Sequence, residues 1–244
     1  MSVSAAFDEL VAHPGAGRRF EQPVAVGLAD TAPSGRVRLD ALARWLQDVA
    51  LADVVDAGLG EAALWVVRRT RLSVTRFPRF GETASAMTFC SGVGRMWAQR
   101  RTTIATPGGG LVEAVALWVH LDPASLRPTP FSERELALYG PSAAGREVKA
   151  RLRHAAPPAG AASRPWTFRS TELDIADHIN NAAYWAVVED ELLARAADPE
   201  AFDAEVEFRT PAQPGPHAVL EDRAHRWVVA PDGTVHASFL LGGG

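Results

Sequence analysis

The apolar positions in the first part of the chain follow a helical spacing between residues 37 and 57. They recur every three or four positions, so they would lie along one face of a helix of about six turns. Gly58 and Gly60 follow, and glycine is typical of the residues that end a helix. The apolar positions are Leu39, Leu42, Ala43, Leu46, Val49, Ala50 and Val54. The pattern therefore predicts an amphipathic helix that packs against a core.

The segments on either side of this helix alternate between apolar and polar residues or form continuous apolar runs, which predicts strands. Residues 111–121 are nearly all apolar, as expected of a central strand that is buried on both faces. Pro23 favours an edge position or a strand start in the first segment. The predicted strands of this half are residues 20–28, 62–77, 82–91, 95–105 and 111–121.

Residues 123–163 break both patterns, because six prolines and many alanines interrupt them. One short helix, at residues 132–139, fits the spacing. We interpret this region as a connector that lies on the surface and not as part of the core.

After the connector the same order of patterns returns. A strand at residues 166–170 precedes a predicted helix at residues 178–197. Short motifs also recur, since Ala43-Arg-Trp45 returns as Ala183-Tyr-Trp185 and Pro107-Gly-Gly as Pro231-Asp-Gly. Four further strands are expected at residues 201–210, 217–222, 226–230 and 234–240. The repeat predicts a tandem α+β fold in which each half is an antiparallel sheet wrapped around one long helix.

The repeat also sets the expected domain boundaries. We place an N-terminal unit at residues 1–122, the connector at residues 123–163 and a C-terminal unit at residues 164–244. The composition supports a sizeable core, because 47% of the 244 residues are hydrophobic and 22% are charged. Such a core needs no metal or disulfide to hold it together.

Charge and cysteine content narrow the class of protein. The net charge of −4 disfavours a nucleic-acid surface. The single cysteine, Cys90, has no partner for an internal disulfide, which favours a reducing compartment. Its alternating apolar surroundings predict a buried strand residue and not a nucleophile. The first residues lack the pattern of a secretory signal, and no apolar run is long enough to span a membrane, so a cytoplasmic location is expected.

Polar side chains concentrate in one stretch, at the start of the second predicted helix. Free backbone N–H groups at a helix start can stabilise an oxyanion, and the amides near residues 177–179 are the expected donors. An aspartate just before the helix can hold or activate water, and a histidine titrates near neutral pH. The residues of the stretch are Asp174, Asp177, His178, Asn180 and Asn181. We interpret it as the candidate active site, with the two asparagines anchoring the loop and substrate.

Each of these residues also has an interpretation without chemistry. Either aspartate can simply cap the helix, and a histidine in its first turn can be structural. Tyr184 is expected in the core, and Glu189 is expected to be a solvated charge on the helix. No metal-ligand spacing connects the histidines at 120, 217, 225 and 236. Five arginines on one strand form either a solvated face or a surface for an acidic partner. They are Arg68, Arg69, Arg71, Arg76 and Arg79.

The motif Asp174-x-x-x-His178-x-Asn180-Asn181-x-x-Tyr184, set in a duplicated frame, resembles the acyl-ACP thioesterases of the hotdog fold. That resemblance covers about residues 20–241. The first half agrees with it. It carries Leu46-Gln47, Trp65-Val-Val-Arg68, Pro78-x-x-Gly81, and Leu117-Trp-Val119 before Asp122. The resemblance implies a tandem double hotdog that hydrolyses fatty acyl thioesters of acyl carrier protein or coenzyme A. It implies catalysis by Asp174 and His178, no metal or redox cofactor, and a homodimer.

The chain also departs from that family's pattern at two places. Ala176 stands where plant members carry an asparagine, and Pro211-Ala-Gln stands where they carry an acidic residue. Either Asp174, His178 and the amides suffice, or Asp177 compensates, or the activity is weak or altered. Two other functions therefore stay open: an enoyl-thioester hydratase/dehydratase, and a non-catalytic protein that binds acyl thioesters.

Overall fold

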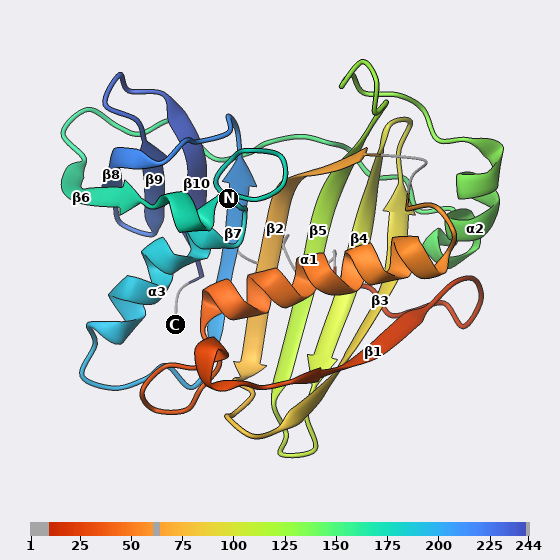
Figure 1. The fold of residues 1–244 in the computed structure, drawn as a ribbon, viewed down its shortest axis with the longest axis horizontal. Helices are drawn as coiled ribbons and strands as arrows, with labels where there is room; N and C mark the ends of the chain where they lie inside the picture. The colour runs from red at the N-terminus through yellow and green to blue at the C-terminus, as the bar shows by residue number, and fades with distance from the viewer. Residues whose placement is uncertain (1–9, 61–63, 243–244) are drawn as a thin grey trace.

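The computed structural model describes residues 10–60 and 64–242, and its strands form one antiparallel sheet (Figure 1). The order across the sheet is β1-β3-β4-β5-β2-β7-β10-β9-β8-β6. The first half supplies β1 (Phe20–Ala25), β2 (Leu64–Arg76), β3 (Thr83–Val93), β4 (Trp97–Ala105) and β5 (Leu111–Leu121). The second half supplies β6 (Ala162–Phe168), β7 (Phe202–Phe208), β8 (Gly215–Asp222), β9 (His225–Val229) and β10 (Val235–Leu241).

The two halves meet where β2 pairs with β7, from Arg69 opposite Glu207 to Val74 opposite Phe202. From this seam outward the strand order of one half mirrors that of the other: β2-β5-β4-β3-β1 against β7-β10-β9-β8-β6. The repeat inferred from the sequence is thus confirmed in space, as is the α+β double-hotdog class. The boundaries given above for the three domains stay a prediction.

Helix α1 (Leu39–Asp56) lies across the sheet of the first half (Figure 1). Successive residues of a strand point to opposite faces of the sheet. The buried face of α1 packs on the apolar side chains of one of these faces, which we call the inner face of the sheet. Two short pieces hold the equivalent place in the second half: a 3₁₀ turn, η4 (Ala183–Trp185), and α3 (Ala186–Leu193). No helix in residues 10–60 and 64–242 has the length and apolar character needed to cross a membrane.

The prediction of one long helix at residues 178–197 is wrong at both ends. Residues 178–182 are not helical, because the side chain of Asn180 accepts a hydrogen bond from the amide of Ala182 at 2.8 Å and so competes with helix formation. The helix ends at Leu193, a few residues before Pro199, which disfavours helical backbone in the residue that precedes it. The apolar spacing was correct only for the middle of the segment.

The connector contains a helix that is longer and more buried than the sequence predicted. Helix α2 (Glu133–Ala143) begins at Ser132, whose hydroxyl accepts a hydrogen bond from the Glu135 amide at 3.3 Å. Tyr139 and Ala143 are buried against β3, beside the buried Cys90. The surface interpretation is therefore wrong for this face of α2. Burial raises the pKa of the Cys90 thiol, which agrees with a structural cysteine.

Two of the five strand arginines lie in the seam and are not a solvated face. Arg69 and Arg71 are buried on the outer face of the sheet, opposite the face that carries α1. Arg71 donates to Asp203 at 2.8 Å, and Arg69 lies 3.5 Å from Glu205. Since β7 supplies both carboxylates, these ion pairs join the two halves. Their counter-charges come from more than 130 residues further along the chain.

Glu189 is also buried, in contrast to the solvated charge expected from the sequence. Its carboxylate lies 2.8 Å from the Arg36 guanidinium and accepts a hydrogen bond from the Leu39 amide at 2.9 Å. It therefore neutralises a buried cation of the first half and supplies an acceptor for the first amide of α1. The second half thus stabilises the start of the long helix in the first half.

The seam should make stability depend on pH. Burial alone would raise the pKa of Glu205, but the hydrogen bond with His154 and the charge of Arg69 outweigh it, so this pKa lies below its usual range. A carboxyl whose pKa is lower in the folded chain stabilises it above the unfolded pKa, and this contribution is lost as the pH falls. We expect the free energy of unfolding, measured with urea between pH 6 and pH 3, to fall less steeply in Glu205→Gln than in wild type. The exposed Glu200→Gln should keep the wild-type slope, and equal slopes for all three proteins would contradict this account.

Candidate active site

The predicted site residues lie on a closed loop between η3 (Ser170–Glu172) and η4. Leu173 and Ile179 form an isolated antiparallel bridge at its base. Within it, the amide of Asp174 donates to the carbonyl of His178 at 2.9 Å, and the amide of Asp177 donates to the carbonyl of Asp174 at 3.0 Å. The backbone thus holds the two predicted catalytic residues next to each other.

The same loop exists in the first half, where it carries no acid–histidine pair. Its bridge joins Thr31 to Val37, and both ends precede those of the second bridge by 142 residues. At the matching place the amide of Ala32 donates to the carbonyl of Arg36 at 2.8 Å. Ala32 therefore takes the place of Asp174, and Arg36 that of His178. The fold needs the loop twice, but only one copy carries groups suited to catalysis.

Backbone conformation explains one choice of residue in the loop. Asp177 has a φ of 58°, and its counterpart Gly35 has a φ of 86°. Aspartate tolerates this left-handed conformation better than most residues do. The side chain of Asp177 is exposed, and its carbonyl accepts a hydrogen bond from Gln213 Nε2 at 2.7 Å. The turn alone therefore accounts for an aspartate at position 177.

The carboxylate of Asp174 is half-buried and is oriented by two contacts. One oxygen accepts a hydrogen bond from the amide of Ala176 at 2.9 Å, and the other lies 3.4 Å from Asn180 Nδ2. A carboxylate offers about four acceptor positions, so lone pairs remain for water. Asp174 thus caps the turn and still keeps capacity for another hydrogen bond.

The expected oxyanion donors are reduced to one. The amide of Asp177 is used inside the loop, and that of Ile179 donates to the carbonyl of Ala212 at 3.0 Å. Within residues 10–60 and 64–242, the amide of His178 has no hydrogen-bond acceptor. These amides belong to a turn and not to a helix start, so the predicted helix dipole does not act there.

The ring of His178 is half-buried, and neither ring nitrogen has a hydrogen-bond partner among the described side chains and carbonyls. The structure brings His178 and Asp174 together through the backbone but does not join their side chains. A substrate or water would therefore find both ring nitrogens available.

Asn180 links the loop to the other half of the molecule. Its Oδ1 accepts hydrogen bonds from the Ala182 amide and, at 3.0 Å, from Gln47 Nε2 on α1. Asn181 is half-buried, and its side chain has no hydrogen bond in the described part of the chain. The loop is thus held against the middle of α1, and sequence reasoning missed Gln47 as a support of the site. The only signal was its place in the Leu46-Gln47 pair.

Gln213 is a second support that the sequence did not reveal. It belongs to the Pro211-Ala-Gln segment, where a catalytic acid was expected and none is present. Its side chain binds the Asp177 carbonyl, while the neighbouring Ala212 carbonyl accepts from Ile179. This segment therefore holds the loop in place but brings no acid to it.

Tyr184 is a core residue, in agreement with its interpretation from the sequence. Its ring packs against Phe168 and Phe208, with ring centroids 5.0 Å and 5.6 Å away. Burial raises its pKa to about 12, although the carbonyl of Ala212 has the opposite effect. The hydroxyl thus stays protonated at neutral pH.

One group of side chains in the described structure has the composition of a metal site, but it lies in the seam. The ligand atoms of His154, Glu205 and Glu207 all lie within 4.8 Å of one another. Arg69 lies 3.5 Å from Glu205, and Arg209 lies 3.4 Å from Glu207. Because these guanidinium groups already balance both carboxylates, the group fits an ion-pair network better than a cation site.

A shallow pocket of about 480 Å³ lies elsewhere, between β1, β3 and the turn after β4. None of its lining residues belongs to the candidate site, so it is not the reaction centre. The lining residues are Glu21, Gln22, Pro23, Thr83, Ala84, Ser85, Ala105, Thr106 and Pro107.

Comparison with known proteins adds an independent finding. Residues 17–139 match the family model described as the acyl-ACP thioesterase N-terminal domain, and residues 156–221 match that of the C-terminal domain. An uncharacterized protein of Mycobacterium tuberculosis is 24% identical over 234 residues, which cover 96% of this chain and 91% of that protein. The two matched segments together span well over half of the chain.

Solved structures share the fold. An acyl-ACP thioesterase from Bacteroides thetaiotaomicron superposes with a TM-score of 0.74 at 17% identity, covering 91% of this chain and 96% of that chain. The 12:0-ACP thioesterase from Umbellularia californica superposes with a TM-score of 0.70 at 19% identity, with the same coverage of both chains. At these identities the likeness concerns the fold.

Proposed function

Since this chain belongs to the acyl-ACP thioesterase family, and so to the thioester hydrolases, we propose that it hydrolyses fatty acyl thioesters at the loop of Asp174 and His178. The observation that carries this placement is the loop itself. It combines an oriented carboxylate that has remaining lone pairs with the histidine ring and the amide of residue 178, neither of which has a hydrogen-bond partner in the described part of the chain. The corresponding loop of the first half has none of these side chains.

The proposed reaction needs few groups. Water bound to Asp174 attacks the thioester carbon and gives its proton to the carboxylate. The carbonyl oxygen gains negative charge and accepts a hydrogen bond from the amide of His178. The carbon–sulfur bond then breaks, and the thiolate takes a proton from solvent or the imidazole. Because a thiol has a pKa of about 8.5, the thiolate leaves without much help from an acid. The role that we propose for the imidazole of His178 is therefore to orient the attacking water toward the thioester carbon.

Ala176 and Pro211 stand where plant members of the family carry an asparagine and an acidic residue, but the proposed reaction uses neither of those two side chains. The amide of Ala176 orients Asp174, a role that needs no side chain, and the segment of Pro211 supports the loop through Ala212 and Gln213. We therefore propose that Asp174, His178 and one amide carry the reaction, with Asn180 as a positioning residue. Acyl carrier protein and coenzyme A are both proposed carriers, in fatty acid metabolism of the cytoplasm. A homodimer stays a prediction.

His178→Ala tests the histidine and the reaction type together. Free thiol release from acyl thioesters of both carriers is followed with a thiol reagent, while loss of enoyl absorbance is followed with enoyl thioesters. We expect the wild-type protein to release thiol, and we expect kcat/KM for this reaction to be lower by about 10²-fold or more in His178→Ala. Loss of enoyl absorbance without thiol release would instead identify a hydratase, and tight binding without either reaction would identify a binding protein.

A further inference from the structure

A band of polar side chains divides the interior of the first half into two apolar parts. The larger part is the main core between α1 and the sheet. The smaller part lies beyond the C-terminal end of α1, where α2 packs on β3, and is centred on Leu59, Cys90, Tyr139 and Ala143. The two parts are separate clusters of buried side chains, although one helix and the same strands border both.

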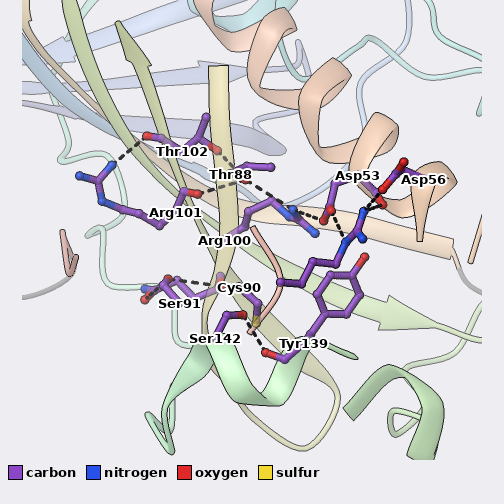
Figure 2. Close-up of polar contacts among 12 residues, drawn as sticks. Asp53, Asp56, Thr88, Cys90, Ser91, Arg100, Arg101, Thr102, Tyr139 and Ser142 are labelled. Atoms are coloured by element: carbon purple, nitrogen blue, oxygen red, sulfur yellow. Dashed lines mark hydrogen bonds and ion pairs between the residues drawn. The ribbon is translucent and has the colours of Figure 1, made fainter. Parts of the chain in front are cut away.

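Asp53 forms the centre of this band. It is the only charged residue among the nine buried residues of α1, and it is 1% exposed. Its carboxylate oxygens accept hydrogen bonds from Arg18 and Arg100, both at 2.6 Å. Arg18 also binds Asp56 at 2.5 Å, so the charges of the group balance. Figure 2 shows Asp53 on the helix facing Arg100 on the strand.

The band continues across the inner face of the sheet. Arg100 on β4 lies 3.4 Å from the Thr88 hydroxyl on β3, which is 3.0 Å from the Thr102 hydroxyl (Figure 2). The guanidinium of Arg100 also lies 5.6 Å from the ring centroid of Tyr139, on the far side of the band. Polar groups therefore extend from α1 to β3.

The distance between the band and the candidate site sets the length of acyl chain that fits between them. Gln47, which binds Asn180 of the catalytic loop, precedes Asp53 by six residues, or about 9 Å along the helix axis. An extended carbon chain advances about 1.2 Å per bond, so about seven or eight bonds fit between these two points. The buried α1 residues between them, Val49 and Ala50, are apolar.

We propose that the Asp53–Arg100 ion pair ends the acyl-chain site and limits this enzyme to acyl groups of medium length. The proposal rests on the function proposed above, with the chain inserted between α1 and the sheet. A longer chain would have to separate buried, hydrogen-bonded charges before its end reached the second apolar part. The few methylene groups gained there do not offset an unpaired buried charge.

Asp53→Leu/Arg100→Met removes the ion pair while Arg18 keeps Asp56 as its partner. Replacing both members of a buried pair by apolar residues is often tolerated, whereas removing one is not. We compare kcat/KM for octanoyl, dodecanoyl and hexadecanoyl thioesters. Wild type should favour the octanoyl chain, which fits the length of about seven or eight bonds, and the double variant should raise the ratio of hexadecanoyl to octanoyl about tenfold or more.

The matched control is Arg101→Met/Glu113→Leu. Arg101 is the neighbour of Arg100 on β4 but points to the opposite face of the sheet, as Figure 2 shows, and it forms an ion pair with Glu113. This variant should keep the wild-type ratio. An unchanged ratio in a folded Asp53→Leu/Arg100→Met protein, or an equal shift in both variants, overturns the proposal.

The wild-type protein tests the inference even where the variant does not fold. A wild-type maximum of kcat/KM at dodecanoyl or a longer chain overturns the length limit but leaves the hydrolase function intact. If no thioester releases thiol, the proposed function fails. Calorimetric binding of octanoate, dodecanoate and hexadecanoate then still tests the length limit. Tighter binding of hexadecanoate than of dodecanoate would contradict it, and weaker binding would support it.

Discussion

Asp174→Asn should lower kcat/KM for thioester hydrolysis by about 10²- to 10⁴-fold, the range expected for the loss of a general base. The asparagine side chain keeps an oxygen that can accept the Ala176 amide, so the turn should stay closed. It loses the negative charge and the ability to take a proton from water. The free energy of unfolding should therefore change little while the catalytic step is lost.

The same substitution separates catalysis from capping. If Asp174 only capped the turn, asparagine would serve as well, because both residues are favoured in such turns. Asp174→Ala would then be the damaging change, through stability. Full activity in Asp174→Asn, together with lower stability in Asp174→Ala, would contradict the catalytic role. Asp177→Asn is the matched control on the same loop, and we expect it to leave kcat/KM within a few-fold of wild type.

Glu189→Leu should have the largest effect on stability, about 3 to 5 kcal/mol of unfolding free energy. The change leaves Arg36, which is 1% exposed, without its buried partner and removes the acceptor of the Leu39 amide. Asp198 stays within 2.8 Å of Arg36 but is partly exposed, so it compensates only in part. Urea unfolding measures the loss.

Two companion variants show whether the lost ion pair causes the effect. Arg36→Met/Glu189→Leu removes both charges and should recover much of the stability that the single change loses. Asp190→Asn, at the exposed neighbouring position, should stay within about 0.5 kcal/mol of wild type. A Glu189→Leu protein as stable as wild type would refute the role of this ion pair in joining the halves.

The sequence predicts the strands well where local pattern decides the structure. The nearly all-apolar run between Gly110 and Asp122 predicts the bounds of β5, and the repeat of patterns predicts the two halves. It fails at the start of the second helix, since an asparagine side chain there takes a backbone amide that a helix would use. Apolar periodicity carries no information about such a competing hydrogen bond.

Charges that are buried against the other half of the molecule could not be predicted from local patterns. Glu189, Arg69 and Arg71 have the spacing of a solvated face, and each is buried because a counter-charge comes from the other half. The dense polar residues of the loop led to the candidate site, and its location stays a prediction. It could not be predicted which of the amides at residues 177–179 lacks an acceptor in the described part of the chain, because the amide of Ile179 donates to the carbonyl of Ala212, which is distant in sequence.

Thiol release by the wild-type protein tests the central claim most directly. The purified full chain is given octanoyl, dodecanoyl and hexadecanoyl thioesters of coenzyme A and of acyl carrier protein, beside Asp174→Asn as the inactive reference. The account predicts that the wild-type protein releases thiol and free fatty acid in equal amounts from the thioesters of at least one carrier. Its turnover rate should exceed that of Asp174→Asn by about 10²-fold or more. Thiol release at the same rate from both proteins, or from neither, would contradict hydrolysis at this loop.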